Sequence, residues 1–95
     1  MFNISEIQIR FTKSKDGVIA YASMVLNGGI FIGGIAIHER PDSRGYRITY
    51  PMKGTFHIYH PINPMCSKLI EEAVISKLKD VMNRAANVRY RGPKN

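Results

Sequence analysis

The sequence predicts an α+β fold in which about five antiparallel strands form a sheet that packs against one long C-terminal helix. Two observations lead to this prediction. Alternating apolar and polar side chains, interrupted by turn-forming pairs, run through residues 1–60, whereas apolar residues at helical spacing run through residues 64–87. Between them, Asn63 is a favourable N-cap residue and Pro64 suits the first position of a helix. This junction therefore divides a β part from an α part.

The first three strands follow from alternation and turn signals. Residues 4–11 alternate between apolar and polar side chains, which predicts a half-buried strand. Residues 13–17 are polar and end in Asp-Gly, which predicts a turn into a second strand over residues 18–26. The pair Asn27-Gly28 predicts a hairpin into a third strand over residues 30–38.

The third strand contains Gly33 and Gly34, a pair that predicts a bulge, a bend or close approach by another chain. A polar loop follows, and residues 46–50 then alternate again, which predicts a fourth strand. Residues 51–54 are expected to turn the chain into a short fifth strand over residues 55–59.

The expected helix carries one apolar stripe at spacings of three and four residues. Its members are Ile70, Val74, Leu78, Val81 and Ala85. Residues 1–87 are therefore expected to form a single α+β domain, and residues 88–95 a basic C-terminal tail. With its edges uncovered, such a small sheet is expected to find a partner, and we predict a homodimer with strand or sheet-face contacts.

The balance of charge points to a polyanionic partner. The chain of 95 residues has 14 lysines and arginines against 7 aspartates and glutamates, a net charge of +7. A positive field of this size favours polyanions such as nucleic acid or an anionic membrane face, although it is also compatible with a merely basic soluble protein. The candidate phosphate contacts lie before, within and just after the fourth strand and toward the C-terminus: Arg40, Arg44, Arg47, Lys53, Arg84, Arg89, Arg91 and Lys94.

Two tyrosines near these arginines have two interpretations. Tyr46 and Tyr50 share a strand face with Ile48, and they are either core residues under the helix or a stacking platform for single-stranded bases. Arg47 projects to the other face of that strand.

His57, His60 and Cys66 are the residues that could carry metal or nucleophilic chemistry. The two histidines are three residues apart, so a regular strand would place them on opposite faces, although the end of the strand could break this alternation. No metal site is predicted, because no third ligand has a suitable spacing. His60 is expected to orient the turn before the helix through a ring hydrogen bond. Cys66 could act with His60 as a nucleophile or could be a small core residue, and we favour the core role because no orienting carboxylate is nearby.

The composition also bears on the cell compartment. A single cysteine allows no internal disulfide and fits a reducing cytosol. No signal peptide and no apolar stretch long enough to span a bilayer is recognised, so we expect a cytoplasmic protein with no membrane partner. No cofactor or small-molecule substrate is expected.

Three segments resemble the SpoVG family of small bacterial proteins, named for stage V sporulation and septation. The first is the opening hairpin, residues 4–10 with 19–23. The second is the run from Gly45 to Lys53, and the third and most specific is His60-Pro61-Ile62-Asn63 followed by the amphipathic helix. The resemblance covers roughly residues 1–83, and the order Tyr50-Pro51-Met52 where the family has Met-Pro-Ser marks a divergent member.

The resemblance implies a dimeric, cytosolic sheet-plus-helix protein that binds DNA, and in some members RNA. Such proteins regulate gene expression linked to cell division septum formation and sporulation, and none is known as an enzyme. The family's nucleic-acid-binding residues near the helix C-terminus would correspond to Lys79, Arg84 and Arg89. The alternatives are a protein-interaction module in cell division with incidental charge, and an enzyme that uses His60 and Cys66.

Overall fold

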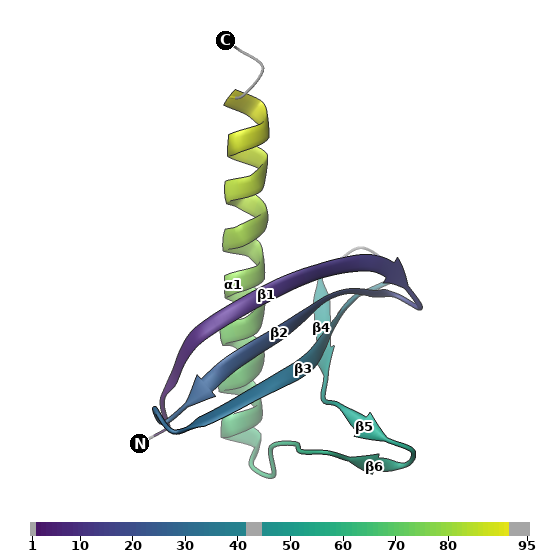
Figure 1. The fold of residues 1–95 in the computed structure, drawn as a ribbon, viewed down its shortest axis with the longest axis vertical. Helices are drawn as coiled ribbons and strands as arrows, with labels where there is room; N and C mark the ends of the chain where they lie inside the picture. The colour runs from purple at the N-terminus through teal and green to yellow at the C-terminus, as the bar shows by residue number, and fades with distance from the viewer. Residues whose placement is uncertain (1, 42–44, 92–95) are drawn as a thin grey trace.

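A computed structural model describes residues 2–41 and 45–91 of the chain, and their side chains except for 14–15 and 86–91. The strands are β1 (Ile4–Lys15), β2 (Val18–Leu26), β3 (Ile30–Glu39), β4 (Tyr46–Thr49), β5 (Met52–Lys53) and β6 (Phe56–His57), and the helix is α1 (Pro64–Arg91) (Figure 1). The first four strands form an antiparallel sheet in the order β1-β2-β3-β4, and β5 pairs with β6 in a separate hairpin. The predicted α+β class is therefore confirmed.

The strand predictions differ from the structure at the first hairpin, at residues 51–54, where β5 forms within the predicted turn, and at the fifth strand. β1 continues to Lys15 because the hairpin needs only Asp16 and Gly17, which both have positive φ angles of 57° and 84°. The fifth strand, predicted over residues 55–59, is confined to Phe56–His57 and pairs with β5 instead of extending the main sheet. The second hairpin turns at Asn27 and Gly28, as predicted, again with positive φ at both residues.

The paired glycines of β3 form a β-bulge. Ala22 pairs with Ile35 and Met24 pairs with Ile32, so that Gly33 and Gly34 together lie opposite the single residue between them on β2. Gly34 has a φ of 75°, which a side chain would disfavour.

The start of α1 is capped as the sequence predicts. The side-chain oxygen of Asn63 accepts hydrogen bonds from the backbone N–H groups of Met65 at 2.8 Å and Cys66 at 3.1 Å. The backbone oxygen of Asn63 accepts from Ser67 at 3.0 Å, which closes the first helical turn. Asn63 therefore satisfies N–H groups that have no partner within the helix.

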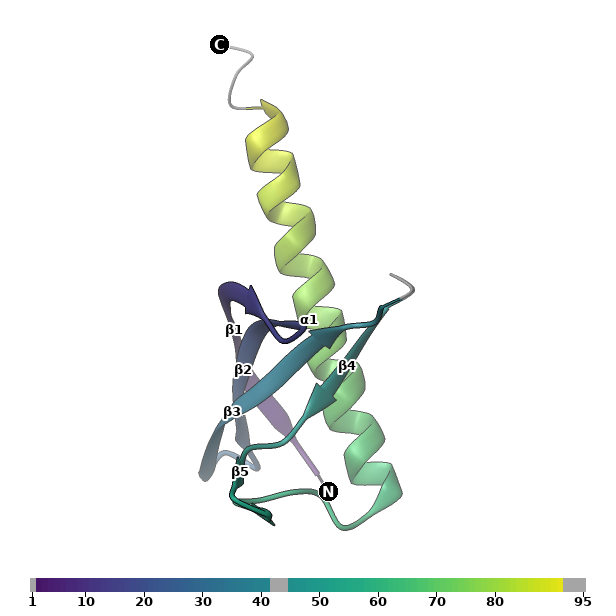
Figure 2. The same ribbon diagram turned by 90° about the vertical axis from the view of Figure 1, so that its right-hand side faces the viewer.

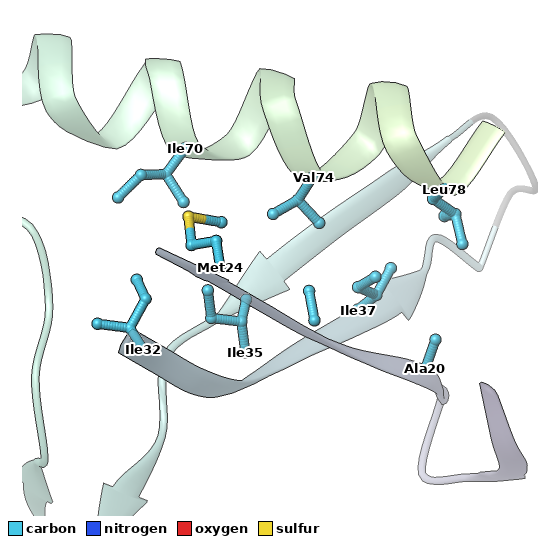
Figure 3. Packing of buried hydrophobic residues seen from close by; sticks show 9 residues of the cluster. Ala20, Met24, Ile32, Ile35, Ile37, Ile70, Val74 and Leu78 are labelled. Carbon is cyan, nitrogen blue, oxygen red and sulfur yellow. The ribbon is translucent and has the colours of Figure 1, made fainter. Parts of the chain in front are cut away.

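The core lies between one face of the sheet and one stripe of the helix. Ile70, Val74 and Leu78 point from α1 toward the sheet, where Met24, Ile35 and Ile37 are the largest side chains that meet them (Figure 3). Ala20, Ala22 and Ile32 complete the buried cluster. Burying side chains of this size contributes about 1.5–3 kcal/mol each, so the helix is held mainly by this contact.

The helix is longer than the sheet that it covers. Its C-terminal half continues past the strands (Figures 1 and 2), and the predicted stripe is used only in part, since Val81 is half-buried and Ala85 is exposed. α1 also reaches Arg91, beyond the end predicted at residue 87. Among the described residues, no helix has the length and hydropathy needed to cross a membrane.

The cap offers a direct test of the junction. We expect Asn63→Ala to lower the free energy of unfolding by about 1 kcal/mol, because the N–H groups of Met65 and Cys66 lose their acceptor. Thermal and urea unfolding measure this change, with Asn63→Asp as the control that keeps an acceptor. Equal stability of the alanine and aspartate variants would contradict the capping role.

Candidate functional site

The predicted cationic residues at the ends of β3 and β4 lie at one end of the sheet. Arg40 directly follows β3 and Arg47 is the second residue of β4, and both are exposed. The turn between β1 and β2 lies beside them, because Glu39 donates its N–H to the backbone oxygen of Gly17 at 3.2 Å. Lys13 near the end of β1 is also exposed. We call Lys13, Arg40 and Arg47, together with the helix residues Lys79 and Arg84, the basic end.

The helix residues join this end because of how α1 crosses the sheet. Leu78 lies above Ile37 and Ala20, near the end of β3 and the start of β2 (Figure 3), so Lys79 and the residues after it continue past that end of the sheet. Arg84 forms the only ion pair among the described residues, with Asp80 at 3.2 Å. Both side chains are largely exposed, so this pair is weak and leaves Arg84 able to contact a phosphate.

The remaining predicted cations are placed differently. Lys53 is exposed on β5, which follows β4 away from the basic end (Figure 1), so the structure does not bring it together with Arg40 and Arg47. Arg44 lies outside the described residues. Arg89 and Arg91 belong to the last turns of α1, but their side chains, like Lys94, lie outside the described part of the chain.

Tyr46 and Tyr50 belong to the core side of the sheet. Both pack against the buried cluster, and the Tyr46 hydroxyl lies 3.7 Å from the sulfur of Met82 on α1. Of the two interpretations of these tyrosines, the core role is therefore confirmed and the stacking platform is wrong for this face. Arg47 lies on the opposite face of β4, as expected for the residue next to Tyr46 in a strand.

His38 shares that outer face of the sheet with Arg47, with which it is paired across β3 and β4. Its Nε2 lies 2.9 Å from the hydroxyl oxygen of Thr49. Burial, and then the positive charge of Arg47, lower the pKa of His38. Because the pKa of histidine is ordinarily about 6.5, His38 is neutral at pH 7 and the charge at this point comes from Arg47.

Tyr50 and Tyr59 connect the sheet to the junction before the helix. Their rings meet edge to face with centroids 5.9 Å apart, and the Tyr59 hydroxyl donates to the backbone oxygen of Gly33 at 2.7 Å. The Tyr50 hydroxyl is buried and has no hydrogen-bond partner among the described residues. Burial, with smaller contributions from Cys66, Tyr59 and Glu71, raises the pKa of Tyr50 to about 12, and burial also raises the pKa of Tyr59.

The two histidines of the junction lie together, contrary to the expectation that they would occupy opposite faces. The rings of His57 and His60 have centroids 4.9 Å apart. Period-two alternation fails here because β6 ends at His57 and the chain bends before His60. His60 Nδ1 lies 3.1 Å from the backbone oxygen of Pro61, which is the ring hydrogen bond expected for the turn. In the described residues, no group of three or more potential ligands could hold a metal.

Cys66 packs against the buried cluster in the first turn of α1. This position confirms the interpretation as a small core residue. The residues of the family motif thus have structural roles: His60 orients the turn, Pro61 and Ile62 lead into the helix, and Asn63 caps it.

Sequence reasoning missed one further cluster, on the sheet face that points away from α1. Arg10, Tyr21 and Phe31 are exposed there around a hollow of about 770 Å³. The signal was present in the sequence, since Arg10 alternates with the core-facing Ile9, and the hairpin turns fix which residues of β2 and β3 lie beside it.

Comparison of sequences finds a protein named for septation that is similar to this chain over most of its length. The chain is 29% identical over 85 residues to the "Putative septation protein SpoVG" of Phytoplasma australiense, and the matched segment covers 84% of this chain and 86% of that protein. This similarity agrees with the resemblance to the SpoVG family that the sequence motifs indicate. No family model matches the sequence. That relative is named for septation and not for an enzymatic activity.

The two tyrosines offer a matched pair of variants. We expect Tyr59→Phe to lower the free energy of unfolding by about 1 kcal/mol, because the oxygen of Gly33 loses its donor. Tyr50→Phe should be neutral or stabilising, because it removes a buried hydroxyl that has no partner. Urea unfolding of both variants measures the difference, and an equal loss in the two would contradict it.

The same variants carry a pH prediction. Folding disfavours ionisation of the Tyr50 hydroxyl, because its folded-state pKa of about 12 lies above the usual 10. The free energy of unfolding is therefore unaffected by this ionisation below pH 10 and falls as the pH rises from 10 through about 12. Tyr50→Phe should therefore retain more stability than the parent chain above pH 10.

Proposed function

We propose that this chain is a non-enzymatic, nucleic-acid-binding regulator of the SpoVG type, which acts as a homodimer in the bacterial cytoplasm and in processes linked to septation or sporulation. The single observation that carries the proposal is the basic end. Lys13, Arg40 and Arg47 on the sheet and Lys79 and Arg84 on the helix are exposed at one end of the molecule. Phosphate contacts of this kind give affinity with little base specificity.

The distribution of acids along α1 supports this assignment. Glu71 and Glu72 lie in the part of the helix that covers the sheet, whereas no acidic residue follows Asp80 in the sequence. The projecting half of the helix is therefore the more positive half. The sequence adds Arg89 and Arg91 to that half and Arg44 to the loop before β4, and we include them in the proposed interface.

A patch at the start of the helix supports self-association. Ile62, Met65 and Leu69 are exposed next to a small hollow that Phe2 also lines. Lys68 and Glu72 flank it, so a second copy related by a two-fold axis would meet an apolar surface with charges of both signs. We call Ile62, Met65 and Leu69 the helix-start patch. The same patch favours the second candidate function, a module that binds a cell-division protein.

Salt dependence tests the nucleic-acid assignment. For a short labelled DNA duplex, we expect affinity to fall steeply with salt, and Arg47→Gln and Lys79→Gln each to make the slope of log K against log salt shallower by about one. Fluorescence anisotropy across a salt series measures both quantities.

The matched control is Lys53→Gln, which removes one exposed cation from β5 and belongs to neither the basic end nor the helix-start patch. Its slope should stay that of the parent chain. A parent chain that binds neither duplex nor single strands at low salt would exclude nucleic-acid binding, and capture of a protein partner that survives nuclease and high salt would favour the interaction module.

The oligomeric state tests the helix-start patch. We expect light scattering at micromolar concentration to give twice the mass of one chain, and Met65→Lys to give the mass of one chain, because burying a lysine in an apolar interface is costly. Met52→Lys, at an exposed methionine on β5, is the control and should remain dimeric. A monomeric parent chain, or an unchanged dimer of Met65→Lys, would refute this interface.

A further inference from the structure

The sheet face away from α1 is hollowed and lined by residues of mixed chemistry. The hollow of about 770 Å³ is bordered by the side chains of Gln8, Arg10, Tyr21, Ser23 and Phe31 and by Gly33. Figure 2 shows α1 on the other side of these strands, and the described part of the chain places no helix over this face. We call this surface the sheet hollow.

The bulge in β3 positions the first aromatic ring of the sheet hollow. A Cβ atom on Gly33 would lie 3.2 Å and 3.4 Å from two ring carbons of Phe31, so the ring lies over the glycine in space that a side chain would occupy. Although it makes this contact, Phe31 remains 70% exposed. One side of the ring is thus supported by the strand while most of its surface remains available to a ligand.

Strand register places the second aromatic ring beside a cation. Tyr21 on β2 pairs with Arg10 on β1, and it is 43% exposed. The same row continues across the sheet through Ala36 and Thr49. The adjoining pair on β3 and β4 is His38 with Arg47. Neither row contains a carboxylate, and the residues that line the hollow, which include both aromatic rings and Arg10, contain none either.

This combination matches the chemistry of a single nucleic-acid strand. Unpaired bases present flat faces that stack on aromatic rings, and arginines beside the rings meet the phosphates. A duplex keeps its bases stacked inside and offers no such faces. Arg47 belongs both to this surface and to the basic end, so the two are continuous.

The charge of the sheet hollow argues against a second copy as its occupant. Bringing two copies of this face together would set Arg10 and Arg47 against the same arginines, with no carboxylate in either row to offset them. The helix-start patch, which is flanked by both signs of charge, has no such conflict.

We propose that the sheet hollow binds single-stranded nucleic acid, with bases stacked on Phe31 and Tyr21 and phosphates held by Arg10 and Arg47. This inference rests on the proposed nucleic-acid function and adds to it a preference for single strands and the residues that create it. The basic end alone would bind duplex and single strands by charge.

The test compares labelled oligouridylate, oligothymidylate and a DNA duplex by fluorescence anisotropy at one salt concentration and across a salt series. We expect Phe31→Ala and Tyr21→Ala each to weaken single-strand binding about tenfold or more while duplex binding and the salt slope stay unchanged. Tyr21→Phe should bind like the parent chain because it keeps the ring. Arg10→Gln should make the single-strand salt slope shallower by about one.

Phe56→Ala is the matched control, because Phe56 is an exposed aromatic residue on β6 and does not line the hollow. Thermal unfolding of each variant separates loss of binding from loss of folding. A strand that contains 2-aminopurine adds a direct readout, since stacking on a protein ring changes its fluorescence in the parent chain and not in the alanine variants.

The outcomes separate this inference from the proposed function. If the duplex binds in a salt-dependent way but neither Phe31→Ala nor Tyr21→Ala weakens single-strand binding, the single-strand site in the sheet hollow is refuted. The proposed nucleic-acid function would then still stand. No binding of any probe by the parent chain would overturn both. A change from dimer to monomer in Phe31→Ala, measured by light scattering, would assign the face to a second copy instead.

Discussion

One amphipathic helix has to close a four-stranded sheet, and the rest of the structure follows from this constraint. α1 offers a single apolar stripe, and Ile70, Val74 and Leu78 are the residues of it that become fully enclosed. A single stripe can cover only one face of a sheet. The opposite face must therefore remain at the surface, and the part of α1 beyond Leu78 has little sheet beneath it (Figures 1 and 2). Both of the surfaces to which we assign nucleic-acid binding arise in this way.

The bulge at Gly33 and Gly34 connects the two faces. On one side, Tyr59 donates to the oxygen of Gly33, and Pro51 lies against Gly34, which ties β3 to the segments that lead into the helix. On the other side, the missing side chain of Gly33 leaves space for the Phe31 ring. Gly33 therefore both accepts the hydrogen bond from Tyr59 before α1 and leaves the space for Phe31 in the sheet hollow. A side chain at Gly33 would have to displace the Phe31 ring, even where the core was left unchanged.

Features set by a few neighbouring residues could be predicted from the sequence, whereas features set by distant contacts could not. The Asn63 cap, the two hairpin turns and the alternation of β4 depend on local chemistry, and they were predicted correctly. The closeness of His57 and His60 was not, because it depends on where β6 stops. Lys53 was grouped with Arg40 and Arg47 by sequence distance, but β5 leaves the sheet and carries it away. Tyr21 and Phe31 were missed because their importance depends on which sheet face the helix leaves open.

The surfaces are arranged so that the proposed contacts do not compete. The helix-start patch begins at Ile62, while Lys79 lies fourteen residues after Met65 on the same helix, about 20 Å further along its axis at 1.5 Å per residue. A second copy seated on the patch therefore leaves the basic end of each chain open. The acids Glu71 and Glu72 lie between the two, next to the apolar contact, and Asp80 is the acid of α1 that lies at the basic end, where it pairs with Arg84. Since a strand that crosses Arg47 can continue onto the sheet hollow, each protomer would present one uninterrupted path, and dimerisation would double the number of paths without altering either.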